Sequence, residues 1–436
     1  MSHVFPRVLG RELPVADRAS GASIWDERGK RYLDAAGGAI VVGIGHGDAG
    51  VVAAMAEQAA RLEYVHGTAF TTEALEAYAA ELAPLLPMEE GRIYPVSGGS
   101  EAMETALKLA RSYHLARGEP DRHRIIARSG SYHGNSRGAL DASGREPLRR
   151  PYLPWLGHAL HVLAPYEYRC PLPRHPAGCG AAHAELLDQA IRAAGPGTVA
   201  CFVAEPISGA TLGAAVPPDD YWPSVHEVCR SHGVLVIADE VMTGFGRTGG
   251  WFASEHWNLR PDILVAGKGA SSGYWPLGLT ACSGEVFDAV ARTGFVHGFT
   301  YSHSVVGAAV GRAVLARLRE DGLVEASRDK GHRLLEDLRA ALAEDPHVGD
   351  VRGRGLMVGI ELVADRSTRA PFPRSSQATE RAVEAARDLG LLLYSSTGGV
   401  DGTNGDLVML GPPFVITEQE LTEAVDKTAG AIAEIR

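Results

Sequence analysis

Between residues 92 and 282, short apolar runs alternate with stretches of helical apolar spacing. The runs occupy residues 92–96, 124–127, 199–204, 234–238, 263–266 and 279–281, and helices are predicted over 100–117, 183–194 and 219–232. Strands that alternate with helices form a mostly parallel sheet covered by helices on both faces. Binding sites in this α/β class gather beyond the carboxyl ends of the strands.

The two ends of the chain have a different pattern. Residues 22–34 are typical of a β-hairpin, and helices are predicted over 49–62, 72–86 and 303–320. Farther on we expect helices over 324–344, 376–389 and 418–435, a strand pair near 348–363 and a strand over 391–394. These segments predict a smaller α+β domain, built from residues 1–48 and 311–436, beside a large domain over 49–310. Residues 144–182 are rich in proline and show little periodicity.

Bulk properties exclude several classes of partner. The net charge of −11 argues against nucleic acid or an anionic membrane, because both bind basic surfaces. No apolar run is long enough to span a bilayer, and the N-terminus shows no secretory signal. Five scattered cysteines are too few for a disulfide framework and indicate a cytoplasmic location.

Lys268 is the residue with the most suggestive surroundings. It is one of five lysines, follows the apolar run 263–266 and is flanked by Gly267 and Gly269. A lysine held in a buried site can lose its proton at modest pH and form a Schiff base with a carbonyl carbon. The alternative is a lysine at a strand end that reaches solvent or caps carbonyls.

Other polar residues also follow predicted strands. Asp239 ends the run 234–238 and could hold the proton of a pyridine nitrogen, or could cap the next helix. The turn Ser97-Gly-Gly-Ser-Glu-Ala102 opens a helix and could bind an anion, or form a capping box. Tyr132 or His133 could stack on a planar ring, and Glu205 adds a second carboxylate. All of them are expected at one edge of the sheet.

Arg352 lies in the C-terminal segment, within Arg352-Gly-Arg-Gly-Leu356. A guanidinium there could bind a substrate carboxylate through two parallel hydrogen bonds. The alternative is a surface arginine in a Gly-rich turn.

Taken together, these motifs resemble those of the class III (ω-type) aminotransferases. The motifs are Ser97-Gly-Gly-Ser-Glu-Ala, Tyr132-His-Gly, Glu205-Pro, Ala238-Asp-Glu-Val-Met-Thr-Gly-Phe-Gly-Arg-Thr-Gly249 and Gly267-Lys-Gly, and the match runs nearly end to end. The resemblance implies fold type I, pyridoxal 5′-phosphate (PLP) as cofactor, and a homodimer. It implies transfer of an amino group from an amine or amino acid to a keto acid or aldehyde through a pyridoxamine form. PLP-dependent racemase, aminomutase or decarboxylase chemistry is the alternative, because relatives share the same site.

The resemblance also implies a role for each site residue. Lys268 would form the Schiff base and shuttle protons, Asp239 would hold the pyridinium proton, and Tyr132 would stack on the ring. The remaining implied cofactor contacts are Gly99, Ser100, His133, Glu205, Met242 and Thr300, with Thr300 reaching the neighbouring subunit's site. Arg352 matches the arginine for the substrate carboxylate, with Arg354 the less favoured choice.

Three positions depart from the family pattern. Ala210 occupies the place of a glutamate that neutralises the carboxylate arginine in some members, which argues against γ-aminobutyrate and 2-oxoglutarate as the specific pair. Met242 replaces a glutamine that contacts the ring hydroxyl in many relatives. His303 is either a substrate contact or, as we expect, a residue of a helix N-terminus.

A group of cysteines and histidines lies outside the family pattern. Cys170, His175, Cys179 and His183 fall in and after the proline-rich loop. Residues of these types at these intervals can bind zinc. We expect ordinary loop packing and no metal, with a zinc site or a loop disulfide as alternatives.

Overall fold

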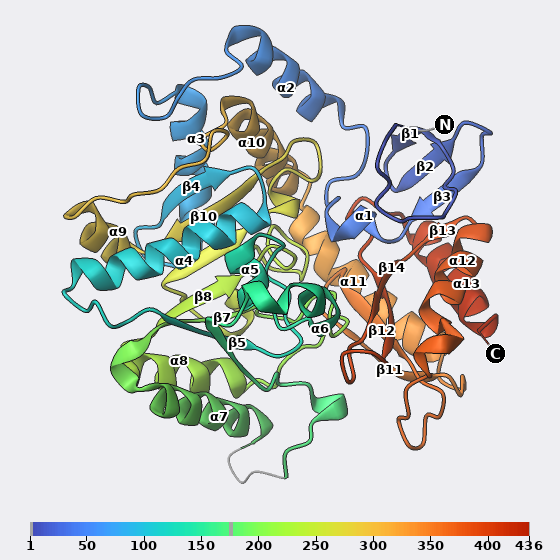
Figure 1. The fold of residues 1–436 in the computed structure, drawn as a ribbon. Helices are drawn as coiled ribbons and strands as arrows, with labels where there is room; N and C mark the ends of the chain where they lie inside the picture. The colour runs from blue at the N-terminus through green and yellow to red at the C-terminus, as the bar shows by residue number, and fades with distance from the viewer. Residues whose placement is uncertain (1–2, 174–177, 436) are drawn as a thin grey trace.

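The computed structural model describes residues 3–173 and 178–435, and a seven-stranded sheet lies at its centre (Figure 1). The strand order is β4-β10-β9-β8-β7-β5-β6. The strands are β4 (Arg92–Val96), β5 (Arg124–Arg128), β6 (Ala159–Val162), β7 (Val199–Ala204), β8 (Leu235–Asp239), β9 (Ile263–Ala266) and β10 (Gly278–Cys282). All neighbouring pairs are parallel except those of β10, which runs antiparallel to both β4 and β9. The mostly parallel sheet is therefore confirmed.

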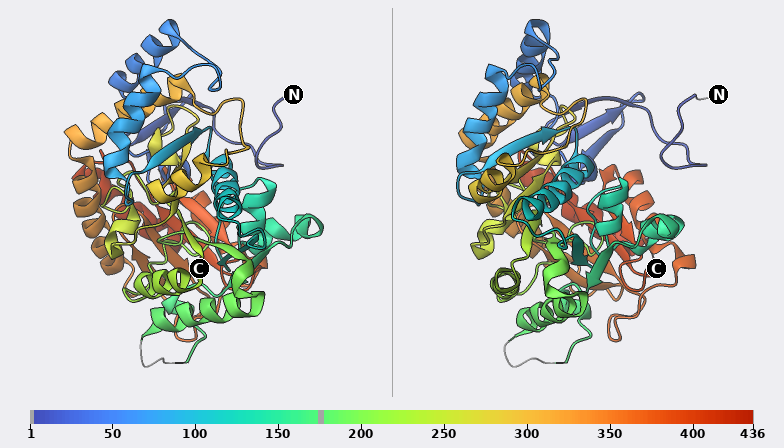
Figure 2. Two further views of the ribbon diagram at one scale, coloured as in Figure 1. Left: turned by 90° about the vertical axis from the view of Figure 1, so that its left-hand side faces the viewer. Right: turned by 60° about the vertical axis from the view of Figure 1, so that its left-hand side comes forward.

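Alternate residues of the central strands enter different cores, as side chains of a strand must. Ile237 and Val265 pack in the cluster of α4 (Gly99–Ala116) and α9 (Gly284–Ala291). Val236 and Phe202 pack in the cluster of α7 (Cys179–Ala194) and α8 (Tyr221–His232). Leu264 joins the core of α3 (Glu73–Leu82) and α10 (Val305–Glu320). Helices thus cover both faces, with α2 (Ala49–Arg61) and α3 at one end of the molecule and α7 and α8 at the other (Figure 2).

The two ends of the chain come together in space, as predicted. The hairpin strands β2 (Ser23–Asp26) and β3 (Arg31–Asp34) form a sheet with β1 (Ala16–Ser20) and with β13 (Leu391–Leu392), which pairs with β3 (Figure 1). A third sheet has the order β11-β12-β15-β14, with β11 (Val348–Gly353), β12 (Val358–Leu362), β14 (Tyr394–Thr397) and β15 (Asp406–Leu410). The helices α11 (Leu323–Ala341), α12 (Ala378–Asp388) and α13 (Glu418–Ala433) pack beside these sheets.

Several predicted elements differ from the structure. The predicted helix 72–86 ends at Leu82 and continues as a 3-10 turn over Ala83–Leu85, because Pro84 cannot extend an α-helix. The proline-rich segment contains the edge strand β6, whose four residues are too few to show a period. The sequence analysis also did not predict helix α9 or strands β1, β14 and β15. The proposed domain boundary at residue 310 falls inside α10, and the domain limits remain a prediction.

The buried Arg247, in the loop after β8, connects the N-terminal and C-terminal segments to the large domain. Arg247 donates hydrogen bonds to the carbonyls of Leu356 at 3.0 Å, Pro412 at 2.7 Å and Val42 at 2.9 Å. Its guanidinium also lies 4.5 Å from the ring centroid of Phe414. Residues of both terminal segments are thereby fixed against the loop that follows β8, close to the predicted site.

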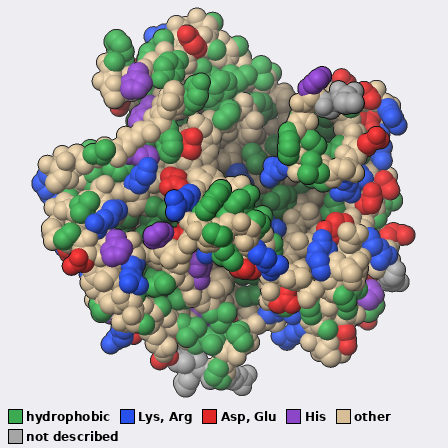
Figure 3. Space-filling model, viewed as in Figure 1, with side chains coloured by type: hydrophobic (Ala, Val, Ile, Leu, Met, Phe, Trp, Pro, Cys, Tyr) green, Lys and Arg blue, Asp and Glu red, His purple; other side chains and the backbone are tan. Residues whose placement is uncertain are grey.

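One face of the molecule has an apolar area and a hollow. In the view of Figure 3, apolar side chains gather over α5 (Arg137–Ala142) and α6 (Glu146–Arg149), and the face is hollowed near its middle. Across the described ranges, none of the helices combines the length and apolar character that crossing a membrane requires.

Candidate active site

Eight of the predicted residues line a single pocket of about 200 Å³ beyond the carboxyl ends of the parallel strands. They are Gly99, Ser100, Tyr132, His133, Glu205, Asp239, Met242 and Lys268. Gly134, Ala210 and Val241 complete the lining. The position of Ala210 shows that the departure from the family pattern falls at the wall of the pocket.

Lys268 begins the turn that follows β9. Its φ of 42° is in the left-handed region, which residues other than glycine seldom adopt. Its amine forms no hydrogen bond or ion pair with the described residues. Burial lowers the pKa of Lys268 to about 8, although the carboxylates of Asp239 and Glu205 raise it. An amine with this pKa exchanges protons readily near neutral pH.

Asp239 ends β8 and is held from two sides. Its Oδ2 lies 2.7 Å from His133 Nδ1, and its Oδ1 accepts a hydrogen bond from the backbone N–H of Val241 at 3.0 Å. The backbone N–H of His133 in turn donates to Ser143 Oγ at 2.8 Å. Both side chains are buried. The carboxylate is therefore oriented, and it is not used as a helix cap.

The neighbouring carboxylate of Glu240 has a structural role, because hydrogen bonds from the loop after β8 satisfy both of its oxygens. Its oxygens accept from the backbone N–H groups of Ser254 at 2.7 Å and Ala253 at 3.0 Å, and from the hydroxyls of Ser254 and Thr243. Every oxygen is satisfied within the loop after β8. Asp239, one residue earlier, lines the pocket instead.

Glu205 follows β7 and is buried beside Lys268. Its Oε1 accepts from the backbone N–H of Gly209 at 3.0 Å, whereas Oε2 has no hydrogen-bond partner among the described residues. Burial raises the pKa of Glu205, and the imidazole of His133 and the guanidinium of Arg128 lower it. Arg128 Nη2 lies 3.9 Å from Oε2 and donates to the Glu205 carbonyl at 2.5 Å. The free oxygen is a hydrogen-bond acceptor available to a ligand.

The turn before α4 has the features of an anion site. Gly99 and Ser100 form the first turn of this 18-residue helix, whose unpaired N–H groups and dipole favour negative charge. A Cβ at position 99 would lie 2.9 Å from Val241 Cγ1, so only glycine fits there. Ser100 Oγ accepts from the backbone N–H of Asn135 at 3.0 Å, which leaves its own proton free to donate.

Tyr132 is half-buried at the wall of the pocket. Burial raises the pKa of its hydroxyl, and the guanidinium of Arg145 lowers it. Arg145 lies in the loop that packs on the Tyr132 segment, through a hydrogen bond from the Gly144 N–H to the Ser131 carbonyl at 3.0 Å. The ring of Tyr132 is thus fixed close to a cation.

Arg145 was missed by the sequence analysis. Its guanidinium forms no hydrogen bond or ion pair with the described residues, and its buried Nε has no acceptor among them. It lines a cavity of about 470 Å³ together with Thr211, the neighbour of Ala210.

Arg352 does not line the pocket of Lys268. Its guanidinium donates to Asp350 Oδ2 at 3.0 Å and to the Leu212 carbonyl at 2.6 Å, and lies 3.0 Å from Glu361 Oε2. The ring of Tyr166 packs against it, with the centroid 4.7 Å away. The structure brings together other site residues and keeps this one engaged elsewhere, so its role toward substrate remains a prediction.

Thr300 is also outside the pocket of its own chain. It is exposed, and its carbonyl accepts a hydrogen bond from the Tyr64 hydroxyl at 3.1 Å. His303 immediately precedes Ser304, the N-cap of α10, and burial lowers its pKa. The position of His303 agrees with the expected helix N-terminus.

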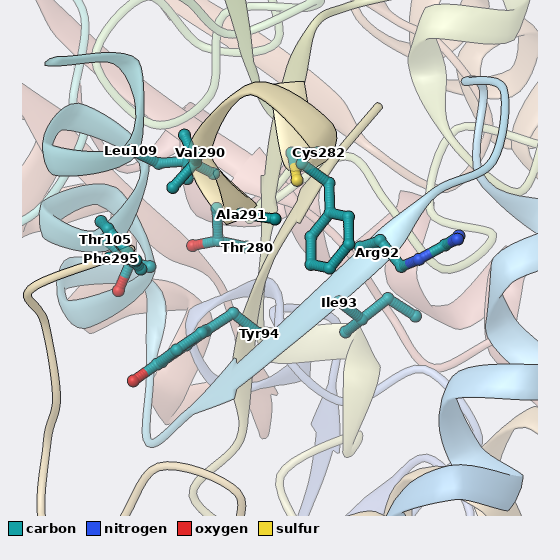
Figure 4. A pocket seen from close by; sticks show the side chains of 11 residues that line it. Arg92, Ile93, Tyr94, Thr105, Leu109, Thr280, Cys282, Val290, Ala291 and Phe295 are labelled. Atoms are coloured by element: carbon teal, nitrogen blue, oxygen red, sulfur yellow. The ribbon is translucent and has the colours of Figure 1, made fainter. Parts of the chain in front are cut away.

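A second cavity, of about 170 Å³, lies between β4, β10, α4 and α9 (Figure 4). Its walls are mainly apolar, with Tyr94, Leu109, Val290 and Phe295 among them. None of the predicted site residues lines it.

The loop cysteines come together with one histidine. Cys170, Cys179 and His183 have side-chain donor atoms that all lie within 4.8 Å of one another. His175 lies outside the described residues.

Comparison with known proteins gives a consistent result. The family model described as aminotransferase class-III matches residues 9–432. The uncharacterized aminotransferase YodT of Bacillus subtilis is 37% identical over 436 residues, which cover 100% of this chain and 98% of that protein. The putrescine–pyruvate aminotransferase of Pseudomonas aeruginosa is 32% identical, over 96% of this chain and 91% of its own length.

Solved structures that are similar to this chain are also transaminases. An (S)-enantioselective omega-transaminase from Thermomicrobium roseum superposes with a TM-score of 0.94 at 34% identity, over 100% of this chain and 96% of that one. An amine transaminase from an uncultivated Pseudomonas species, solved in its PLP-bound form, gives a TM-score of 0.92 at 34% identity, over 100% and 98% of the two chains.

Proposed function

We propose, from the premise that this chain belongs to the class III aminotransferase family, that Lys268 is the residue that binds the cofactor covalently. The chain is a PLP-dependent transaminase, which moves an amino group from an amine or amino acid to a keto acid or aldehyde. Racemase, aminomutase and decarboxylase chemistry gains no support from these relatives, which are named as aminotransferases.

The residues of the pocket fit PLP. A phosphate needs N–H and O–H donors, and the start of α4 supplies these through Gly99 and Ser100, while the nearby Glu101 carboxylate accepts from the Ser97 N–H. A protonated pyridine nitrogen needs an oriented carboxylate, which Asp239 supplies. Bound PLP supplies an aldehyde that condenses with amines and a ring that withdraws electrons from the adjacent carbon.

Lys268 would act as nucleophile and then as proton carrier. With a pKa of about 8, a useful fraction of its amine is neutral at physiological pH, and it can accept and return a proton at Nζ. The absence of a hydrogen-bond partner among the described residues leaves Nζ free to do both.

Asp239 and His133 would act as a pair. His133 donates to Asp239 Oδ2 at 2.7 Å and fixes the position of this oxygen. Asp239 would then hold a proton on the ring nitrogen. We propose that His133 positions Asp239 and that Tyr132 stacks on the ring of PLP. Glu205 and Met242 would contact the edge of this ring.

We propose that Arg145 binds the carboxylate of the substrate. Arg145 has a guanidinium without a carboxylate partner in the described chain and lies close to Tyr132, whereas Arg352 is occupied by Asp350 and the Leu212 carbonyl. A cation without a carboxylate partner among the described residues favours amino and keto acids over simple amines. Arg352 keeps its predicted role only if these contacts are exchanged for substrate.

We also propose that the active form is a homodimer. Thr300 would contribute to the neighbouring site, since it is exposed and lies outside its own pocket. Large apolar side chains of the same segment are exposed too, with Val296 at 99% and Tyr301 at 68%. Burial in a subunit interface accounts for such a patch. Light scattering of the eluting peak in size-exclusion chromatography measures the mass directly. A cytoplasmic location remains a prediction from the cysteine count.

The observation that carries the assignment of Lys268 is its partly buried, unpartnered amine at the meeting point of the other site residues. The protein loaded with PLP is reduced with borohydride, digested and analysed by mass spectrometry. We expect the cofactor mass on Lys268 alone. Attachment to any of the other four lysines, Lys30, Lys108, Lys330 or Lys427, overturns the proposal. A parallel absorption titration with amine donors, without acceptor, identifies the donor class.

A further inference from the structure

We propose that Cys170, Cys179 and His183 form a zinc site that anchors the loop before α7. Cys170 follows the 3-10 turn Glu167–Arg169, Cys179 is the first residue of α7, and His183 lies one turn farther along that helix. None of these three residues lines the pocket of Lys268. The zinc site is therefore separate from the transaminase chemistry.

The spacing of the donor atoms fits a tetrahedral metal. Cys170 Sγ lies 3.8 Å from Cys179 Sγ and 3.8 Å from His183 Nε2. Two thiolates bound about 2.3 Å from one zinc ion are about 3.8 Å apart at the tetrahedral angle, and a thiolate and an imidazole nitrogen are about 3.6 Å apart. Cys179 Sγ lies 3.7 Å from His183 Nδ1, the other imidazole nitrogen, and the ligand atoms of the three residues all lie within 4.8 Å of one another, so binding of one ion requires movements of the side chains.

The histidine is oriented for metal binding. His183 Nδ1 lies 2.8 Å from the carbonyl oxygen of Cys179, one helical turn earlier. A neutral imidazole has one N–H, so donation from Nδ1 leaves the lone pair of Nε2 facing Cys170. This arrangement, a carbonyl fixing the far nitrogen of a ligating imidazole, is common in zinc sites. His183 is buried, which holds the ring in this orientation.

A disulfide and simple packing are the two alternatives to zinc at these side chains. A disulfide between Cys170 and Cys179 would shorten the sulfur separation from 3.8 Å to about 2.05 Å and give His183 no role. Simple packing would keep the present contacts, with the Cys170 thiol donating to His183 Nε2 and Nδ1 donating to the Cys179 carbonyl, so it differs from the zinc site in metal content. Zinc uses all three side chains as ligands and leaves one of its four coordination positions open.

The ion would stabilise contacts between the loop and the third sheet. Arg169, next to Cys170, forms a contact with Glu361 of β12. Tyr166 packs on the guanidinium of Arg352, which belongs to β11. Fixing Cys170 to α7 would therefore hold two residues, Tyr166 and Arg169, beside Arg352 and Glu361.

The test measures metal and thiols in the full-length enzyme, purified without chelator or a metal-affinity tag. We expect about one zinc per chain. We also expect five titratable thiols in denaturant with chelator and without reductant, which is the full cysteine count. Zinc below about 0.1 per chain with five thiols refutes the site and supports packing. Three thiols, two fewer than five, refute it in favour of the disulfide.

Variants assign the ligands. Cys170→Ser and Cys179→Ser should each lower the zinc content at least fivefold, whereas Cys282→Ser, which changes a buried thiol outside the cluster, should leave it unchanged. Equal zinc in all three variants overturns the assignment. Because a serine variant can fail to fold, the unmodified chain is also loaded with Co²⁺ after zinc removal. A thiolate-to-cobalt charge-transfer band is expected, and its absence overturns the proposal without any variant.

Discussion

Replacing Lys268 with methionine should stabilise the cofactor-free protein, although it removes the residue on which activity depends. Methionine has nearly the length of the lysine stem and no charge. The lysine amine lies at a partly buried position without a hydrogen-bond partner in the described chain, and burial lowers its pKa from 10.5 to about 8. A charged amine therefore costs folding free energy at neutral pH.

The magnitude follows from the two pKa values. A difference of about 2.5 corresponds to about 3 kcal/mol, since each pKa unit is about 1.4 kcal/mol. Below pH 8 the amine is charged in both states, and the folded state bears the full cost. Between about pH 8 and 10.5 the unfolded chain binds more protons than the folded chain, so stability rises with pH. Above 10.5 both states are neutral and the cost is gone.

Urea unfolding of the cofactor-free protein at two pH values provides the assay. Lys268→Met should be more stable than the unmodified chain by about 3 kcal/mol near pH 7, and by about 1.4 kcal/mol near pH 9.5. Apolar packing of the methionine adds a gain that does not depend on pH. The change of about 2 kcal/mol between the two conditions is therefore the diagnostic quantity.

Lys108→Met is the matched control, because Lys108 is exposed on α4. Its effect on stability should be the same at both pH values. The reasoning is refuted if Lys268→Met and the unmodified chain change in parallel between pH 7 and 9.5. The amine would then be solvated in the folded protein, and its reactivity could not arise from burial.

Three further substitutions distinguish residues that act on the substrate or cofactor from residues that stabilise the fold. Arg352→Met should lower the free energy of unfolding by about 3 kcal/mol, because Glu361 loses a buried cationic partner, and should leave the KM for a keto acid unchanged; urea unfolding and steady-state kinetics measure both. Arg145→Met should raise the KM for a keto acid by about 10- to 100-fold and leave that for an uncharged aldehyde unchanged, a result that equal effects on both acceptors would contradict. Asp239→Asn should lower kcat by about a hundredfold with PLP still bound, as followed by absorption, and full activity would exclude its role at the ring nitrogen.

The edge of the sheet was predictable because buried strands have a strong pattern. The runs 199–204, 234–238 and 263–266 are continuously apolar, as strands covered on both faces must be. Their ends therefore fix where Glu205, Asp239 and the turn of Lys268 lie. Parallel pairing then brings these ends to one side, where Glu205, Asp239 and Lys268 line one pocket.

The contacts of Arg352 were not predictable from the motif. Asp350 lies two residues earlier on the same face of β11, and Glu361 lies on β12 opposite Asp350. Alternation and register together create this acidic surrounding, but the register is known only from the structure. Arg145 was missed for the opposite reason, since the absence of a partner leaves no pattern in a sequence.

The two adjacent carboxylates at the end of β8 also could not be told apart from the sequence pattern alone. Asp239 and Glu240 are adjacent and both buried, yet one lines the pocket and the other accepts hydrogen bonds from the loop over Ala253–Trp257. The resemblance to the family identified the functional one. Composition and spacing alone could not, because either residue could have capped the loop.

Arg247 connects the assembly of the fold to the state of Lys268. The carbonyls of Val42, Leu356 and Pro412 place its guanidinium at the junction of the terminal segments with the large sheet. Its positive charge acts in the same direction as burial and lowers the pKa of Lys268, against Asp239 and Glu205. Packing of the terminal segments thus fixes a cation that favours the neutral, nucleophilic amine. Loosening that junction should therefore raise the pKa of Lys268 as well as lower stability, so the two ends of the chain contribute to reactivity without lining the pocket of Lys268.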